Sequence, residues 1–412
     1  MPASPQIAIV GAGPAGCFLA QALLRTSPTL HVDVIDTLPV PYGLLRYGVA
    51  TDHQGTKAVA RQFARVFERQ GARFFGNVHI GRDVTLDALR ASYDAVVLAT
   101  GLHQDRRLGV PGDDLPGVIG AGALTRALYE HPDAQALPDL GTHPVVIGNG
   151  NVAIDVVRVL LKTQSEFDGS DLGAGPGRWL DDNRIDSLTV FGRSPAASAK
   201  FDAVMIRELG KLQNVSVRVS GLGDPADDDA PVIAALREVG ESESAAAGTT
   251  LEFCFSMQVA QIIGDDGVTA VRFHTPDGPL EWPATSVITA IGFESNPDLP
   301  RSDLLRHATD RERGILGPGL FGAGWFCHGP RGTIPDARRG AADMAATVLE
   351  FTEVDPKKAG ARIFESLPDV VSYDGWQRID NAEVHAAPAT RVRQKLTHRR
   401  ELLSEARPEE PS

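Results

Sequence analysis

The pattern of apolar and polar positions predicts that one supersecondary unit occurs twice along the chain. In the first copy, an apolar run at 7–10 ends in glycine, a helical stretch follows over about 14–24, and another apolar run occupies 31–35. The second copy repeats this order between residues 145 and 191. Short apolar runs that end in glycine are typical of buried parallel strands. Each copy is therefore predicted to form a β-α-β unit.

The rest of the pattern outlines further elements. Strands are predicted at 95–99 and 287–292, and an alanine-rich helix is predicted within 322–350. Two segments rich in glycine and in small or acidic residues, 166–178 and 221–248, are predicted to be loops.

The first β-α-β unit carries a glycine motif with a specific spacing. Gly11, Gly13 and Gly16 lie between the strand and the helix. In a dinucleotide site the first glycine permits the tight turn, the second lets a pyrophosphate approach, and the third lets helix and strand pack closely. The helix N-terminus then favours the phosphates. Asp36 ends the second strand, where a carboxylate accepts hydrogen bonds from ribose hydroxyls. Because strand, glycines, helix, strand and acid occur in order, we predict a dinucleotide site rather than a chance turn.

The second unit carries the related motif Gly148-Asn149-Gly150-Asn151-Val152-Ala153, in which alanine replaces the third glycine. Its next strand ends without an acidic residue and is followed by Arg193. An arginine there can pair with the 2′-phosphate of NADP, whereas an acid would repel it. The motif thus favours NADP over NAD. The alternative interpretation of Arg193 is a solvated loop charge.

Together the two motifs predict an α/β fold with two Rossmann-like dinucleotide-binding domains, one for FAD and one for NAD(P). The proline- and glycine-rich stretch at 110–117 indicates a crossing between them. We predict a discontinuous FAD-binding domain of residues 1–104 and 293–412, into which an NAD(P)-binding domain of residues 105–292 is inserted. A length of 412 residues accommodates such an arrangement.

Composition narrows the choice of function. The net charge of −13 disfavours nonspecific binding to nucleic acid. Three widely spaced cysteines, Cys17, Cys254 and Cys327, argue against a disulfide framework, an iron–sulfur cluster and a redox-active disulfide, and no metal site is predicted. No apolar run reaches the ~20 residues of a membrane helix, and no signal peptide is evident. A reducing cytoplasm is the expected location.

The sequence resembles the adrenodoxin-reductase-type ferredoxin–NADP reductases over about residues 7–349. The stretches that carry the resemblance are LPVPYGLLRYGVATDH at 38–53, RFFGNV at 73–78, DDLPG at 113–117, HPD at 131–133, GNGNVAID at 148–155, GW at 324–325 and GPRGTI at 329–334. The resemblance implies FAD contacts at Ala15, Asp36, Leu44, Val78, Trp325, Gly332, Thr333 and Ile334. It implies NADP contacts at Asn149, Gly150, Asn151, Val152, Arg193 and Gly332.

The resemblance also implies that His53, Asp155 and Glu208 flank the flavin as proton-handling or positioning groups. Transfer from nicotinamide to flavin depends on stacking and orientation more than on an acid or a base. Other interpretations stay open. Asp155 suits a helix cap or a salt bridge, Glu208 a solvated helix position, and His53 a hydrogen-bonded turn.

Two departures from the family pattern concern specificity. Where the family carries two adjacent arginines, this chain has Arg193-Ser194, so the preference for NADP is expected to be weaker or shared with NADH. Basic residues are usual between Trp325 and Gly329, where this chain has Phe326-Cys327-His328. This second departure lies near the expected exit surface for electrons and bears on the identity of the partner.

The function implied by the resemblance is transfer of electrons from NAD(P)H through FAD to a ferredoxin-type iron–sulfur protein that feeds a cytochrome P450 or similar oxygenase. Lys57, Arg61, Arg65 and Arg69 recur every four residues on a predicted helix and form a candidate docking stripe, or simply a solvated face. The alternative function is an NAD(P)H-dependent flavoenzyme that reduces a small molecule or quinone. A closed apolar pocket over the flavin would favour that alternative.

Overall fold

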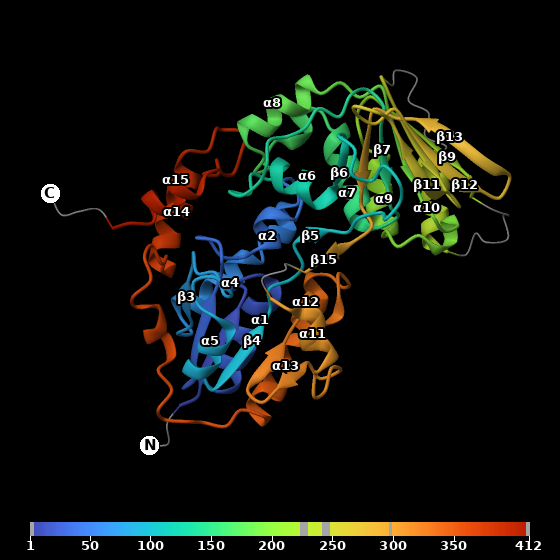
Figure 1. Cartoon of the computed structure of the whole chain (residues 1–412). Coiled ribbons are helices and arrows are strands. Elements are labelled where there is room, and N and C mark those ends of the chain that lie inside the picture. The colour runs from blue at the N-terminus through green and yellow to red at the C-terminus, as the bar shows by residue number, and fades with distance from the viewer. Residues whose placement is uncertain (1–3, 223–229, 241–247, 296–298, 409–412) are drawn as a thin grey trace. The chain divides into compact units, whose positions relative to one another are not determined.

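The chain divides into two compact units in the computed structural model (Figure 1). The first unit comprises Met1–Val49, His53–Gln104 and Phe293–Ser412, and the second comprises Ala50–Asp52 and Asp105–Gly292. The residues that the structure describes are 4–222, 230–240, 248–295 and 299–408. Each unit has its own sheet and its own hydrophobic core.

The first unit is built on a six-stranded sheet with the order β16-β17-β4-β1-β2-β3, parallel except for the antiparallel β16–β17 pair. Its strands are β1 (Gln6–Val10), β2 (His31–Ile35), β3 (Arg73–Phe75), β4 (Ala95–Leu98), β16 (Ile315–Gly317) and β17 (Leu320–Gly322). Its helices are α1 (Pro14–Thr26), α2 (Leu44–Tyr47), α3 (Gln54–Lys57), α4 (Ala60–Glu68), α5 (Leu86–Ser92), α11 (Arg301–Arg306), α12 (Trp325–His328), α13 (Ile334–Glu350), η4 (Gly360–Phe364), α14 (Tyr373–His385) and α15 (Arg399–Glu405).

The sheet of the first unit separates two hydrophobic cores, because successive side chains of a strand point to opposite faces of the sheet. Ile7 and Ile9 face a core that includes side chains of α1, α4 and α13, whereas Ala8 and Val10 face one that includes α5 and η4. Successive strand residues point to opposite faces, so a run apolar at every position is buried on both sides. The continuous apolar run at the start of the chain therefore lies at the centre of a three-layer unit.

The second unit has a six-stranded sheet with the order β6-β14-β7-β8-β10-β9, all of whose pairs are parallel. The strands are β6 (Val118–Gly120), β7 (Pro144–Ile147), β8 (Ser187–Phe191), β9 (Val215–Ser220), β10 (Thr249–Cys254) and β14 (Ser286–Thr289). The helices are α6 (Ala121–Leu128), α7 (Asn151–Leu161), η1 (Gln164–Phe167), α8 (Ala174–Asp182), η2 (Ala196–Ser198), α9 (Ala203–Leu209) and α10 (Pro231–Gly240).

A second, antiparallel sheet covers one face of the parallel sheet in the second unit. It consists of β11 (Gln258–Ile263), β12 (Ala270–Thr275) and β13 (Gly278–Pro283). The ring of Phe273 from this sheet packs against the ring of Phe191 of β8 in a tilted arrangement, with 4.3 Å between ring centroids. The opposite face is covered by helices that include α7, α9 and α10. This unit is therefore layered as sheet, sheet and helices.

The predicted fold class is confirmed, because each unit has a mainly or wholly parallel six-stranded sheet with helices packed on it, and the second unit is inserted into the first. The sequence did not predict the sheet β11–β13. Two loop predictions were wrong in part. Segment 166–178 contains the end of η1 and the start of α8, and segment 221–248 contains α10, in which Ile233, Ala235, Leu236 and Val239 are buried. Residues 223–229 and 241–247 lie outside the described part of the chain.

Candidate nucleotide-binding and electron-transfer sites

The glycine loop of the first unit has the backbone geometry of a phosphate-binding turn. Gly11 has a φ of +113°, and a Cβ there would lie 2.4 Å from the carbonyl oxygen of Ala99. A Cβ on Gly16 would lie 2.0 Å from the carbonyl oxygen of Gly11, so the third glycine allows α1 to pack on the turn. A Cβ on Gly13, the N-cap of α1, would meet no atom within 4 Å. The space above the second glycine is thus open, as a pyrophosphate requires.

Asp36 lies directly beside this loop. Its carboxylate accepts hydrogen bonds from the backbone N–H groups of Ala12, at 2.7 Å, and of Leu38, at 2.9 Å. Burial raises the pKa of Asp36, and the two backbone hydrogen bonds oppose that shift. A carboxylate in such a place gains from further donors, which ribose hydroxyls would supply.

Leu44 and Val78 lie on segments that are bonded to the same loop. The N–H of Tyr42 donates to the carbonyl of Ala12 at 2.9 Å, and α2 begins two residues later at Leu44, whose side chain is 40% exposed. The N–H of Val78 donates to the carbonyl of Asp36 at 3.0 Å, and Val78 is buried. The structure therefore brings both predicted FAD contacts to the carboxyl ends of β1 and β2.

The return segment of the chain reaches α1 through Gly324. A Cβ on Gly324 would lie 2.6 Å from the Cβ of Ala15 in the first turn of α1. The indole N–H of the next residue, Trp325, points to the carbonyl of Gly332 at 3.4 Å. Thr333 and Asp336 form a capping box at the start of α13. The segment 325–334, which carries predicted FAD contacts, therefore begins beside the glycine loop of the same unit.

Side chains near the C-terminus form hydrogen bonds and ion pairs with the stretch that follows the first glycine loop. Arg46 of α2 is buried and donates to Glu383 of α14 at 2.5 Å, and Arg393 donates to the same carboxylate at 2.9 Å. The hydroxyls of Tyr42 and Tyr373 lie 3.0 Å apart. The sequence left the role of this segment open, since partners more than 300 positions apart carry no local signal.

The glycine loop of the second unit has the same geometry. Gly148 has a φ of +141°, and its Cβ would lie 2.2 Å from the carbonyl oxygen of Ala290. Gly150 caps α7, and a Cβ there would meet nothing within 4 Å. Ala153, in the position of the third glycine, is completely buried. The side chain of Asn151 accepts a hydrogen bond from the N–H of Asp202 at 2.8 Å.

Asn149 gives a second indication that this loop accommodates a ligand. Both polar atoms of its amide are buried and have no hydrogen-bond partner among the described residues. Buried polar groups normally find a partner, so an orphaned amide in a glycine loop is what a missing ligand would leave. The residues of both loops thus fit a dinucleotide, with an open position at the second glycine of each.

Asp155 and Glu208 come together at one buried cation that the sequence did not single out. Arg158, whose side chain is 2% exposed, lies 3.1 Å from Asp155 and 3.4 Å from Glu208. It also holds Asp52 by two hydrogen bonds, and Lys162 reaches the same carboxylate at 2.5 Å. We name these five residues the Arg158 cluster. Arg158 lies three residues after Asp155 on α7. This spacing places the two side chains on one face of a helix, and it was the feature of the sequence that could have indicated their contact.

Electrostatics keep Asp52 and Arg158 ionised. Burial alone would raise the pKa of Asp52, but hydrogen bonds and charges from Arg158 and Lys162 outweigh it and hold the pKa well below its usual range. Burial lowers the pKa of Arg158, and Asp52 and Asp155 raise it overall. Asp155 therefore makes the salt bridge that the alternative interpretation expected, and its exposed fraction of 22% leaves it partly accessible.

His53 belongs to the first unit, where it is the half-buried N-cap residue of α3. It directly follows Asp52, which clusters with the second unit. The structure thus groups two of the three predicted catalytic residues around Arg158 and places the third next in sequence to another member of the Arg158 cluster.

The three cysteines are free and buried. Burial raises the pKa of Cys327 to about 11 and of Cys254 to about 12, so both thiols are protonated at neutral pH. Protonated, buried thiols are poor nucleophiles. No helix among the described residues is long and apolar enough to cross a membrane.

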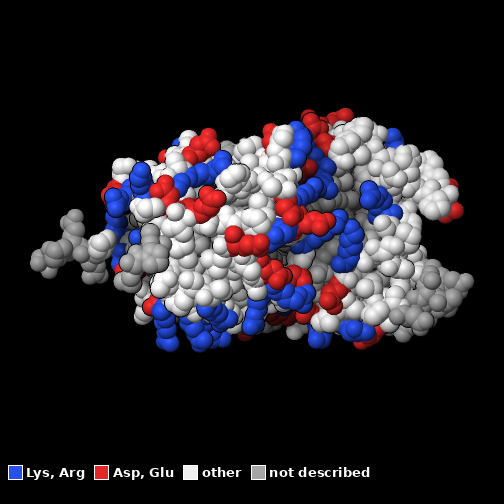
Figure 2. Space-filling model, turned by 90° about the horizontal axis from the view of Figure 1, so that it is seen from below, with Lys and Arg blue, Asp and Glu red and all other residues white. Residues whose placement is uncertain are grey.

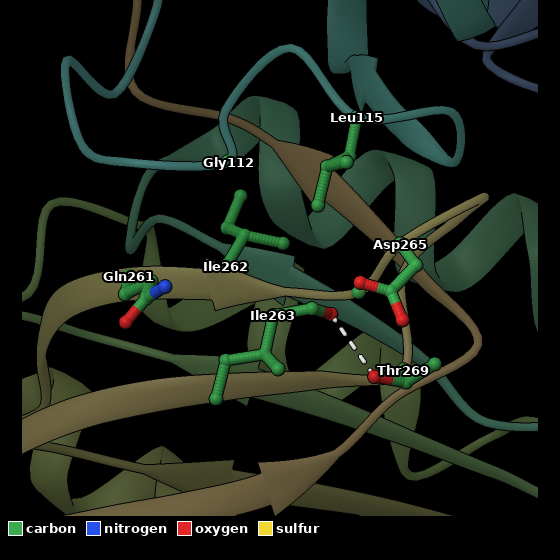
Figure 3. A pocket seen from close by; sticks show the side chains of 8 residues that line it. Gly112, Leu115, Gln261, Ile262, Ile263, Asp265 and Thr269 are labelled. Carbon is green, nitrogen blue, oxygen red and sulfur yellow. Dashed lines mark hydrogen bonds between the residues drawn. The ribbon is translucent and has the colours of Figure 1, made fainter.

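A surface hollow in the second unit carries no candidate chemistry (Figure 3). Its lining comes from the 110–117 segment and from β11 and its turn, namely Gly112, Leu115, Gln261, Ile262, Ile263, Gly264, Asp265 and Thr269. The hydroxyl of Thr269 donates a hydrogen bond to the carbonyl oxygen of Ile263 at 3.2 Å. None of the predicted site residues contributes to it.

The basic stripe (Lys57, Arg61, Arg65 and Arg69) follows α3 and α4 in the first unit. Its three arginines are exposed, and Lys57 is half-buried. Lysine and arginine side chains also gather in groups on the face shown in Figure 2, despite the net charge of −13. Local groups of positive side chains therefore occur on a surface whose overall charge is negative.

Comparison with known proteins gives consistent results. The family described as pyridine nucleotide-disulphide oxidoreductase matches residues 5–207. Cindoxin reductase of Citrobacter braakii is 38% identical over 98% of this chain and 91% of that protein. NADPH-ferredoxin reductase FprA of Mycobacterium tuberculosis is 32% identical over 96% of this chain and 98% of that protein. The solved structure of that FprA in complex with NADPH matches with a TM-score of 0.90 at 31% identity, covering 98% of this chain and 100% of that one.

These features define an oxidoreductase that uses FAD and NADP(H) on two Rossmann-like units. The chain belongs to the family of NADPH-dependent ferredoxin and adrenodoxin reductases. The predicted cofactors and the predicted class of enzyme are thereby confirmed. The alternative, a quinone or small-molecule reductase, is not favoured by these relatives.

Proposed function

We propose that this chain carries electrons from NADPH through FAD to a ferredoxin-type iron–sulfur protein. The observation that carries the proposal is the presence of two glycine loops in one chain, each with an open position at its second glycine, Gly13 or Gly150. Relatives along nearly the whole length are named NADPH-ferredoxin and adrenodoxin reductases, which supports an iron–sulfur protein as the acceptor.

We propose that each of the two units binds one cofactor. Residues 1–104 and 293–412 form the FAD-binding domain, with contacts at Gly11, Gly13, Ala15, Gly16, Asp36, Leu44, Val78, Trp325, Gly332, Thr333 and Ile334. Residues 105–292 form the NADP-binding domain, with contacts at Gly148, Asn149, Gly150, Asn151, Val152 and Arg193. Open loop geometry on both and the orphaned amide of Asn149 support this assignment.

FAD, when bound, would supply the conversion between a two-electron donor and one-electron acceptors. The chain supplies binding and orientation. Asp155 and Glu208 are proposed to orient the nicotinamide or handle protons, because both are partly exposed yet fixed by buried Arg158. His53 is proposed to act alongside them from the start of α3.

The proposed acceptor is a small acidic iron–sulfur protein that passes its electrons to a cytochrome P450 or a similar oxygenase. The basic stripe on α3 and α4 supports docking of an acidic protein, because complementary charge speeds and orients encounters. The proposed location is the cytoplasm, which suits three buried free thiols.

The test is anaerobic stopped-flow bleaching of the flavin band of the purified protein with NADPH and with NADH. Fast bleaching by NADPH and slower bleaching by NADH are expected if Arg193 contacts the 2′-phosphate. A reduced ferredoxin should then appear when that acceptor is mixed with the bleached protein. No bleaching with either nucleotide would overturn the assignment of the second glycine loop. Bleaching without ferredoxin reduction would overturn the proposed acceptor.

A further inference from the structure

One segment of the second unit contacts Asn149 of the glycine loop at both of its ends. At its start, Gly192 lies against the side chain of Asn149, so that a Cβ on Gly192 would sit 1.7 Å from Nδ2 of that amide. At its end, the N–H of Lys200 donates to the carbonyl of Asn149 at 2.8 Å. Residues 192–200 therefore form a loop that begins and ends beside Asn149. We call this segment the 192–200 loop.

The 192–200 loop presents positive charge without a nearby neutralising partner. Arg193 and Lys200 are exposed, and neither forms an ion pair with any described residue. The loop contains no aspartate or glutamate. The first acid after it is Asp202, whose carboxylate accepts the N–H of Val204 at 2.8 Å as the N-cap of α9.

The neighbouring chain is also uncharged. The N–H of Met257 donates to the carbonyl of Gly192 at 2.9 Å, and that of Ser256 donates to the carbonyl of Ser194 at 3.2 Å. Residues 254–257 contain no charged side chain. The two cations that form no ion pair therefore lie on residues that flank Asn149, and neither the 192–200 loop nor residues 254–257 carries a carboxylate, which favours a ligand group of high negative charge.

We propose that Lys200 acts with Arg193 as a specificity-determining residue that binds the 2′-phosphate of NADP(H). The proposal rests on the assignment of NADP to the second glycine loop. Arg193 stands next to an uncharged Ser194, so Lys200 supplies the second positive charge from the other end of the 192–200 loop. Arginine binds a phosphate by two parallel hydrogen bonds, and lysine adds a flexible point charge.

The experiment measures binding to the purified FAD-containing protein by isothermal titration calorimetry, with no turnover. The two probes are adenosine 2′,5′-bisphosphate and 5′-AMP, which differ by the 2′-phosphate alone. The variants are Arg193→Ala, Lys200→Ala, the double variant and Lys200→Arg. Lys211→Ala is the matched control, because Lys211 is exposed but precedes β9, at the amino end of the parallel strands, whereas the 192–200 loop follows the carboxyl end of β8.

Lys200→Ala is expected to weaken binding of the bisphosphate by about tenfold, the effect of one lost charge-assisted hydrogen bond, and to leave 5′-AMP unchanged. The double variant should bind both probes equally, Lys200→Arg should retain the preference, and Lys211→Ala should match the unaltered protein. Unchanged bisphosphate binding in Lys200→Ala, with a loss in Arg193→Ala, would overturn the role of Lys200 and leave the proposed function standing. Failure of the unaltered protein to bind either probe would overturn the proposed function itself.

Discussion

Arg46 and Glu383 form a buried ion pair between residues 337 positions apart in the sequence. The guanidinium of Arg46 also lies 5.2 Å from the ring centre of Trp376 on α14, so it is held by charge and by an aromatic face. Arg46 belongs to α2, which begins directly after Gly43, and a Cβ on Gly43 would lie 3.1 Å from the Cα of Gly13. The C-terminal helices thus support the loop proposed to bind FAD.

Replacing Glu383 by alanine is expected to destabilise the first unit by about 3–5 kcal/mol, because it leaves the buried cation of Arg46 without its partner. Denaturant unfolding followed by tryptophan fluorescence would measure the loss. Flavin content after gel filtration should fall as well, since α2 loses its anchor. The control is Glu365→Ala, whose side chain is exposed; its free energy of unfolding should change by less than about 0.5 kcal/mol. Equal effects in both variants would refute the supporting role of α14.

The same pair predicts how stability depends on pH. Burial alone would raise the pKa of Glu383, but the charge and hydrogen bonds of Arg46, with the charge of Arg393, lower it overall. A carboxyl group with a depressed pKa stabilises the fold above its unfolded pKa, about 4.3, and loses this effect as pH falls through its folded pKa. Glu383→Gln should therefore be less stable than the unaltered protein at pH 7 and still at pH 5, and the difference should shrink below about pH 4. Urea unfolding across this range would measure it, and a difference that grows toward acid would contradict the prediction.

The local architecture was predictable because its signals are local. The helix expected over about 14–24 is α1, and the strand expected over 31–35 is β2. Gly11 and Gly148 both adopt positive φ values, as their places in the two motifs require. Apolar runs, turns and glycine spacing depend on a few neighbouring residues, so they can be read from a single sequence.

The Arg158 cluster could be predicted only in part. Asp155 and Glu208 were expected near the flavin, but their common contact with Arg158 depends on how α7 and α9 pack. The hydrogen bond from Arg158 to Asp52 joins residues 106 positions apart in the sequence. A periodic pattern of apolar residues indicates only contacts between near neighbours, so it could not have predicted this one.

The wrong loop predictions have a different cause. In α10, Ile233, Leu236 and Val239 are buried at helical spacing, but the glycine- and acid-rich flanks of segment 221–248 obscured this pattern. In α8, Gly175 and Gly177 lie within a helix that they would weaken in isolation. Tertiary packing overrides such propensities, as burial of Pro176 and Gly177 indicates.

Asp155→Asn and Glu208→Gln separate an orienting role from a purely structural one. If both carboxylates orient the nicotinamide or handle protons, each variant should slow flavin bleaching by NADPH, by up to about a hundredfold, with normal flavin content. If they only neutralise Arg158, the melting temperature should fall and the bleaching rate should not. We expect the first result, because both side chains remain partly exposed while Arg158 is buried. Arg207→Ala is a matched control, since Arg207 adjoins Glu208 and makes a surface ion pair with Glu238. It should leave the bleaching rate unchanged.

The two open glycines predict a reciprocal pair of binding defects. Gly13 has a φ of −73° and Gly150 of −115°, values that any residue adopts, and a Cβ at either position would meet no protein atom within 4 Å. Gly13→Val and Gly150→Val should therefore fold, and circular dichroism should confirm it. The added side chain would occupy the space where a pyrophosphate approaches the backbone.

Gly13→Val should purify without the yellow flavin colour yet still bind adenosine 2′,5′-bisphosphate in calorimetry. Gly150→Val should retain flavin and lose that binding. Each variant serves as the control for the other, since the two changes are chemically identical and lie in equivalent loops. Full flavin in Gly13→Val would refute the FAD assignment of the first glycine loop, and intact bisphosphate binding in Gly150→Val would refute the NADP assignment of the second. Loss of both ligands in either variant would mean that the two loops do not act as separate sites.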